Sequence, residues 1–408
     1  MIEFGRKKEL KRLLSLRGNG KIKVVTGLRR CGKSYLLSPL FTRELLLWGI
    51  SSADIVELNL VGKDYGIDTP EKLSKAIKES VGPNTKFLIV DEAQRAGDGF
   101  AGVFLALLSS RPDVDCYITG SNSDILSKDI VRQFKGKAKE VKVSPLTFAE
   151  IREAIPDYPF EKYLRFGGLP LILNCEDDES RETELRDLWE NTYLSDIHDR
   201  FKGKLISERA QKGIIIGILS NITSPTSEKR ITKTILGGLH QTKAETAQMH
   251  AEIGDLIQAA RDSFLLIGFE QIGLEPSNEW MIENSLKNYC VDVGLLRAIS
   301  KSYSIDGDAL ENAVFLRIIS KGYETHGEEI MRNDGTKGEV DFVYEKAGKT
   351  HFVQVAFLLS ETNRHRELSF LEEKAGDSLF VPEMVCHECR IKDVPDGIHM
   401  FVGEEFFL

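Results

Sequence analysis

The chain has 408 residues and a formal net charge of −9, because 63 Asp and Glu outnumber 54 Lys and Arg. Hydrophobic residues make up 41% and charged residues 29%, which is typical of a globular protein, and the length favours two to four domains. No stretch offers the roughly 18 apolar residues that a membrane-spanning helix needs, and the acidic balance disfavours a protein coated in nucleic acid, although it leaves room for a local basic face.

The first 147 residues alternate strand and helix patterns. The run Phe87–Val90 is apolar throughout, as in a strand that is buried on both faces of a parallel sheet. The alternation predicts a doubly wound α/β domain over 1–147. Its strands are expected over 21–26, 54–60, 86–91, 114–119 and 141–143, and its helices over 32–48, 70–81 and 100–109.

Beyond Pro145 the pattern changes. Helical periodicity dominates to about residue 204, with a break at the Gly-Gly-Leu-Pro turn of 167–170, and we expect a helical lid over 148–204. Further helices follow, and the strand-like stretches 264–269 and 287–291 resemble the β-wing of a winged helix. We therefore expect a winged-helix-like domain over 205–304.

The last hundred residues return to a mixed pattern. A helix is expected over 310–321, and two adjacent strands over 338–344 and 350–357. These elements predict a second, C-terminal α/β domain over 305–408.

The segment 27–34 reads GLRRCGKS, a complete G-x-x-x-x-G-K-S motif directly after a strand and directly before a helix. Such a loop aims backbone amides at phosphate oxygens, while its lysine adds a positive charge and its serine a ligand for Mg²⁺. A chance glycine-rich turn is the alternative, and the strand-loop-helix context makes it improbable. The residues expected to contact ATP are Gly27, Arg29, Arg30, Cys31, Gly32, Lys33, Ser34 and Tyr35.

Two acids, Asp91 and Glu92, end the apolar strand that follows. We expect Asp91 and Ser34 to hold Mg²⁺ and Glu92 to polarise the attacking water. Lys33 is expected to take part in catalysis through its positive charge toward the β- and γ-phosphate oxygens. Acids that merely end a strand would be a reasonable interpretation without the upstream loop. The second carboxylate favours hydrolysis over binding alone, because a binding module needs no base.

The strand over 114–119 is followed by small polar residues. In P-loop ATPases with an additional strand, this strand lies between the two above and presents a polar sensor to the γ-phosphate. Asn122, with Ser121 beside it, is our candidate catalytic sensor. An ordinary Gly, Ser and Asn turn is the competing interpretation.

Together these residues resemble a prokaryotic family of AAA+ ATPases with a C-terminal domain of unknown function that looks nuclease-like. The resemblance covers most of the chain. The ordered motifs that carry it are GLRRCGKS (27–34), LIVDEAQ (88–94), ITGSNS (118–123), SPLTF (144–148), GGLP (167–170), KNYCVDVGLLRA (287–298), LENAVF (310–315) and GEVDFV (338–343).

The resemblance implies that Gly168 and Pro170, with the segment 4–6, border the adenine. It also implies an arginine finger from a Gly-Arg pair after the sensor strand. Here the pair reads Gly136-Lys137, and Lys cannot reproduce the planar fork of Arg. Either hydrolysis is slow or another arginine takes this role.

The resemblance further implies a winged helix and a PD-(D/E)XK nuclease-like fold. The candidate recognition helix, 246–261, carries Glu252 and Asp255 against Arg261, so packing is favoured over DNA reading. The nuclease-like region supplies Glu311 and Asp341 as acids. Its D/E-x-K tripeptide has become QVA at 354–356, so we expect the fold without nuclease activity.

Six cysteines are scattered along the chain, and only Cys386 and Cys389, in CHEC, resemble half of a zinc site. No second ligand pair lies nearby, so structural or incidental cysteines are the better interpretation. The first residues lack the pattern of a secretory signal, and we expect a cytoplasmic protein.

The predicted function is Mg²⁺-dependent ATP binding and slow hydrolysis that rearranges the domains. The alternatives are a nucleotide-dependent switch with negligible turnover and an ATP-coupled protein that binds or processes DNA. The expected partners are ATP and ADP, with DNA or a protein client as candidates and no membrane. An oligomer is compatible with the sequence.

Overall fold

A computed structural model describes residues 2–62, 64, 66–120, 133–201, 206–220, 243–272, 286–299, 306–332 and 335–408. The chain forms two compact units. Unit 1 comprises Met1–Pro145 and Leu169–Leu171, and unit 2 comprises Leu146–Gly168 and Ile172–Leu408. The polypeptide therefore passes between the units at the junctions 145/146, 168/169 and 171/172.

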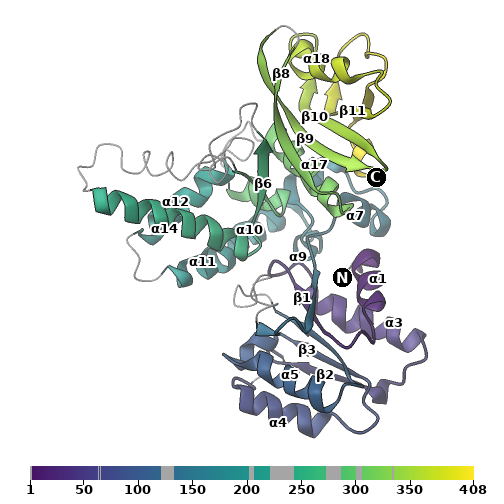
Figure 1. The fold of residues 1–408 in the computed structure, drawn as a ribbon, viewed down its shortest axis with the longest axis vertical. Helices are drawn as coiled ribbons and strands as arrows, with labels where there is room; N and C mark the ends of the chain where they lie inside the picture. The colour runs from purple at the N-terminus through teal and green to yellow at the C-terminus, as the bar shows by residue number, and fades with distance from the viewer. Residues whose placement is uncertain are drawn as a thin grey trace. The chain divides into compact units, whose positions relative to one another are not determined.

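Unit 1 is built on a five-stranded parallel sheet in the order β2-β3-β4-β1-β5, drawn from purple to blue in Figure 1. This order confirms the α/β class and places β4 between β1 and β3, as expected. The strands are β1 (Ile22–Thr26), β2 (Ile55–Asn59), β3 (Phe87–Asp91), β4 (Asp115–Thr119) and β5 (Ala138–Lys142). The helical segments are α1 (Lys7–Ser15), α2 (Lys33–Tyr35), η1 (Leu36–Phe41), α3 (Thr42–Leu47), η2 (Ser52–Asp54), α4 (Pro70–Ser80), η3 (Ala93–Ala96) and α5 (Phe100–Ser110).

The core of unit 1 follows from the apolar strands. Leu88 and Val90 of β3 are fully buried in one cluster with Leu73 of α4 and Phe104 of α5. Burying side chains of this size contributes roughly 1.5–3 kcal/mol each. This cluster packs the helices against the sheet. The carboxyl ends of the strands lie outside it.

The helix that we predict over 32–48 is interrupted, which corrects the prediction. Ser38 has extended backbone angles (φ −137°, ψ 112°) inside η1, between α2 and α3. The cause is Pro39, because a proline ring disfavours helical angles at the residue before it and lacks an N–H to donate.

Unit 2 combines helices with a mixed seven-stranded sheet in the order β12-β11-β10-β9-β8-β6-β7. The strands are β6 (Leu266–Ile272), β7 (Leu286–Cys290), β8 (Thr325–Met331), β9 (Lys337–Lys346), β10 (Lys349–Leu359), β11 (Phe380–Cys389) and β12 (His399–Val402). The helical segments are α7 (Phe148–Ala154), α8 (Phe160–Phe166), α10 (Asp178–Asp187), η5 (Leu188–Tyr193), α11 (Leu194–Arg200), α12 (Glu208–Leu219), α14 (Lys243–Asp262), α16 (Val293–Ile299), α17 (Asp306–Ser320), α18 (Arg364–Lys374) and η6 (Glu405–Phe407). The short helix α9 (Pro170–Leu173) runs across the 171/172 junction.

The hairpin of β6 and β7 is part of this sheet. The two strands pair antiparallel, and β6 also pairs with β8 through Gln271 and Gly327. The segments 205–304 and 305–408, which we predict as separate domains, thus share one continuous sheet. Four aromatic rings pack α17 against it, with Tyr289 and Phe315 stacked at 4.3 Å between ring centroids and Phe269 and Phe342 beside them.

None of the described helices combines the length and the apolar character that crossing a membrane requires.

Candidate nucleotide-binding site

The loop between β1 and α2 has the backbone of a phosphate-binding loop. Gly27, Arg30 and Gly32 have positive φ angles of 143°, 66° and 100°. A Cβ on Gly27 would lie 2.1 Å from the carbonyl oxygen of Val143, so only glycine fits there. Cys31 is buried, and its Sγ donates to the same carbonyl at 3.3 Å. The loop is thus fixed against the chain that follows β5.

Lys33 lies inside this loop. Its side chain is buried, and its Nζ donates to the carbonyl oxygens of Gly27 at 3.0 Å and Leu28 at 2.9 Å. Backbone carbonyls of the phosphate-binding loop therefore hold the Lys33 ammonium. Arg29 is half-buried and Arg30 is exposed.

Two further residues lie against Gly32. Pro170 Cγ is 3.6 Å from the position of a Cβ on Gly32, and an Arg6 guanidinium nitrogen is 3.8 Å from it. Arg6 is buried, and its Nη2 donates to the carbonyl oxygen of Cys31 at 2.6 Å. The structure brings Pro170 and Arg6 to the loop. Gly168 belongs to unit 2, and its place beside the adenine stays a prediction.

Tyr35 also contacts the N-terminal segment. Burial raises its pKa, and Glu3, which is hydrogen-bonded to it, raises it further. Arg43 holds the Glu3 carboxylate with two hydrogen bonds of 2.6 and 3.1 Å. This contact fixes the N-terminal segment against the first turn after the loop.

The carboxyl ends of β3 and β4 complete the site. Ser34 Oγ donates to Asp91 Oδ1 at 2.9 Å, and Thr119 Oγ1 donates to the same oxygen at 2.5 Å. Burial raises the pKa of Asp91, and the two hydroxyl donors oppose that rise. Asp91 is thus a half-buried carboxylate at the mouth of the loop.

Thr119 also positions Glu92. The Glu92 amide donates to Thr119 Oγ1 at 2.8 Å, and the Glu92 backbone has left-handed angles (φ 56°, ψ 46°). Its carboxylate accepts a hydrogen bond from Gln94 Nε2. Thr119 therefore links both acids, and sequence reasoning missed it. The signal was a polar residue ending a strand that pairs with β1 and β3.

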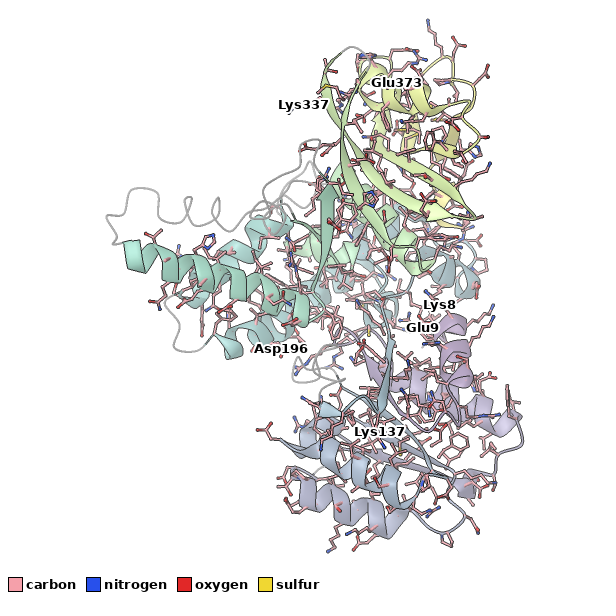
Figure 2. All side chains as sticks on the ribbon, in the orientation of Figure 1. Lys8, Glu9, Lys137, Asp196, Lys337 and Glu373 are labelled. Atoms are coloured by element: carbon pink, nitrogen blue, oxygen red, sulfur yellow. The ribbon has the colours of Figure 1, made fainter. Side chains whose placement is uncertain are left out.

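The other sensor and finger positions are only partly described. Ser121 and Asn122 lie outside the described residues. Lys137, labelled in Figure 2, directly precedes β5, and its carbonyl accepts from the Ile22 amide at 3.0 Å. It is a backbone partner of β1 in unit 1.

The residues present fit a magnesium-bound nucleotide. Mg²⁺ prefers oxygen ligands and takes few from protein, with phosphates and waters supplying the rest. Ser34 and Asp91 place a hydroxyl and a carboxylate side by side. Among the described residues no group of three His, Cys, Asp or Glu side chains could hold a metal ion, so no all-protein metal cage lies in that part of the chain.

Residues 19–152 match the family model described as an AAA domain. Together with the sheet order and the loop geometry, this match decides the class of unit 1. Residues 19–152 are similar to an AAA domain and carry a phosphate-binding loop. ATP binding is the function that this domain supports.

Two relatives match nearly the whole chain. An uncharacterised protein of Haemophilus influenzae is 28% identical over 383 residues, with 91% of each chain covered. An uncharacterised protein of Methanocaldococcus jannaschii is 26% identical over 376 residues, covering 88% of this chain and 79% of that protein. The similarity therefore extends through unit 2, beyond the AAA+ domain.

Solved structures match less well. A variant of RuvB from Thermotoga maritima is 16% identical and covers 65% of this chain and 89% of its own, with a TM-score of 0.31. The replication initiator DnaA, bound to AMPPCP and single-stranded DNA, is 14% identical and covers 64% of this chain and 88% of its own, with a TM-score of 0.29. Scores this low carry no argument about function.

The predicted nuclease-like acids meet in the core of unit 2. Glu311 of α17 and Asp341 of β9 are both buried. Glu311 accepts from Tyr289 Oη at 2.6 Å, and Asp341 accepts from the Val355 amide at 2.7 Å. Burial raises the pKa of Glu311 to about 7, and burial together with Glu311 raises the pKa of Asp341 well above its usual range.

A lysine that sequence reasoning missed completes this cluster. Lys287 of β7 is fully buried, and its Nζ lies 3.6 Å from a carboxylate oxygen of Glu339 and 4.0 Å from one of Glu311. It comes from a different strand than the one where the tripeptide lysine is expected. Because β7 is far from β9 in sequence, only the fold reveals it.

The candidate recognition helix lies within α14 and uses its charges for packing. Glu252 is buried and accepts from the Ile206 amide at 3.1 Å. Arg261 donates to Asn288 Oδ1 at 2.7 and 2.9 Å. These contacts join α14 to neighbouring segments of unit 2.

The CHEC segment lies on β11. Cys386 is buried, and burial raises the pKa of its thiol to about 12, which disfavours the thiolate that zinc needs. The ring of His387 stacks on Phe357 at 4.7 Å between centroids. Cys386 and His387 therefore contribute to side-chain packing in unit 2.

Proposed function

We propose that this chain is a Mg²⁺-dependent ATPase with slow turnover, whose nucleotide state changes the arrangement of its two units. The observation that carries the proposal is the pair of bonds from Ser34 and Thr119 to Asp91, directly beside the phosphate-binding loop. Mg²⁺ held by Ser34 and Asp91 would neutralise phosphate charge there.

The remaining roles fall on the residues of the loop and of β3. The Lys33 ammonium would exchange its two carbonyl partners for phosphate oxygens, which are stronger acceptors because they are charged. The Glu92 carboxylate would orient the attacking water once its hydrogen bond from Gln94 is broken. Thr119 would hold the backbone of Glu92 in place.

The test is a phosphate-release assay with purified wild type, Lys33→Ala and Glu92→Gln, each with and without Mg²⁺. Lys33→Ala should lose nucleotide binding, whereas Glu92→Gln should bind ATP and release no phosphate above background. Glu79→Gln is the control, because Glu79 is an exposed acid on α4 in the same unit. Wild-type release no faster than that of Glu92→Gln would contradict hydrolysis.

One observation favours a nucleotide-dependent switch as the second candidate. The Glu92 carboxylate is engaged by Gln94, and lysines stand where the resemblance implies an arginine. With its base held in this way, the enzyme would hydrolyse ATP slowly or not at all. Purified protein that retains ADP or ATP tightly and shows no turnover, even in Gln94→Ala, would favour this candidate.

For the C-terminal part we propose a nuclease-like fold without nuclease activity. The cation beside Glu311 is Lys287 of the protein itself, and the amide of Gln354 replaces an acid of the tripeptide. Incubation with DNA and Mg²⁺ or Mn²⁺ should give no cleavage. Cleavage that disappears in Asp341→Ala would overturn this proposal.

A further inference from the structure

Two of the connections that leave unit 1 contact the phosphate-binding loop. The first follows β5, where the carbonyl of Val143 contacts Gly27 and accepts from Cys31. The second is Leu169–Leu171, where Pro170 lies against Gly32. Any movement of the loop therefore acts on both connections.

In unit 2 the same two connections meet at one point. Leu146 and Gly168 are the first residues of unit 2 at the junctions 145/146 and 168/169. The Leu146 amide donates to the Gly168 carbonyl oxygen at 2.8 Å. A Cβ on Gly168 would lie 1.9 Å from the carbonyl oxygen of Leu146, so the contact requires glycine. The two connections are thus hydrogen-bonded to each other at the boundary of unit 2.

Asp292 holds this joint. Its Oδ2 accepts from the Gly168 amide at 2.7 Å, while its Oδ1 accepts from the amides of Gly294 at 2.9 Å and Leu295 at 3.1 Å, in the first turn of α16. Capping a helix requires only one acceptor oxygen. The second oxygen is therefore specific to the connection.

The surroundings show that the chain is built around this carboxylate. Asp292 is buried, and a Cβ on Gly167 would lie 2.0 Å from its Oδ1. Gly167 also has a positive φ of 71°. On the far side, a Cβ on Gly294 would lie 2.2 Å from the carbonyl oxygen of Phe166. Three glycines thus let α16 approach the connection closely enough for the carboxylate to grip it.

We propose that Asp292 is a positioning residue for the nucleotide site. By holding Gly168, and through it Leu146, it fixes the two connections that contact the phosphate-binding loop, and it transmits nucleotide-dependent movement of that loop to α16. This inference rests on the proposed nucleotide-binding function. It adds a residue of unit 2, far from the loop in sequence, to the machinery of that site.

The test compares Asp292→Asn with Asp177→Asn. Asn has one acceptor oxygen where Asp292 uses two, so either Gly168 or the α16 amides lose their partner. Asp177 caps α10 in the same unit through the Ser180 amide at 2.7 Å and touches neither connection. We expect the dissociation constant for fluorescent ADP to rise about five- to tenfold in Asp292→Asn and to stay at the wild-type value in Asp177→Asn. Asp292→Ser, which retains a cap for α16, is the second variant should the first fail to fold.

Hydrogen exchange gives a readout that a purely structural role would not move. In wild type, ADP should change the protection of the Gly294 and Leu295 amides, and in Asp292→Asn or Asp292→Ser this response should disappear. Unchanged ADP affinity together with a persisting exchange response would overturn the inference. Wild type that binds ADP without hydrolysing ATP would contradict only the proposed hydrolysis, and wild type that binds no nucleotide would overturn both.

Discussion

Each unit holds a cluster of acids, half-buried in unit 1 and buried in unit 2, and the two clusters differ in what surrounds them. In unit 1, Asp91 accepts from two hydroxyls and makes no ion pair among the described residues, although the nearby charge of Lys33 lowers its pKa. In unit 2, Glu311 and Asp341 face the ammonium of Lys287. A carboxylate that accepts from hydroxyls can still bind a metal ion, whereas a buried lysine occupies the position that a metal ion would take. The first site is therefore suited to take a cation from outside, whereas the second site carries its own.

Removing the internal cation should have the largest effect. In Lys287→Met the buried Glu311 carboxylate loses its compensating charge, and we expect a loss of about 3–5 kcal/mol in the free energy of unfolding at pH 8, where Glu311 is ionised. Denaturant unfolding followed by circular dichroism measures it. Adding Glu311→Gln should recover part of the loss. An unfolding free energy within about 1 kcal/mol of wild type would contradict the role of Lys287.

Removing the acid of unit 1 should affect catalysis more than stability. Asp91→Asn retains the shape and a hydrogen-bond acceptor but lowers the charge at the metal position. We expect ATP hydrolysis to fall by about 100-fold or more, with a changed Mg²⁺ requirement. Phosphate release over a Mg²⁺ titration checks this. Hydrolysis within a few-fold of wild type would place the metal elsewhere.

The raised pKa of Glu311 predicts a pH dependence. The folded-state pKa of about 7 lies above the unfolded value of 4.5, so stability is fully present at low pH and falls as pH rises through this window. Replacement by Gln should reduce that fall by about 2–3 kcal/mol. Unfolding at pH 5 and pH 8 tests it, and an equal fall in wild type and Glu311→Gln would sink the idea.

The smallest effect is expected at Thr119. Valine keeps its shape but removes the bonds to Asp91 and to the Glu92 amide. Stability should drop by about 1–2 kcal/mol and hydrolysis by about tenfold. Thr85→Val is the matched control, because this buried threonine accepts from the Gly82 amide at 3.0 Å away from the site. Equal hydrolysis in the two variants would make Thr119 purely structural.

The features that could be predicted from the sequence are those formed by residues close together in the chain. The strands β1 to β4 were predicted to within one residue at each end, whereas α1 was not predicted. The position of β4 between β1 and β3 was expected from P-loop ATPases with an additional strand. The break at Pro39 was missed because apolar periodicity continues across it.

The phosphate-binding loop and the acids that follow β3 can be found in the sequence alone, because the backbone fixes the geometry of residues that are contiguous in a motif. The tertiary structure alone decided that Thr119 joins those acids, that Lys287 meets Glu311, and that Asp292 holds Gly168 across 124 residues. Such contacts depend on how strands and helices pack. No local pattern records that packing.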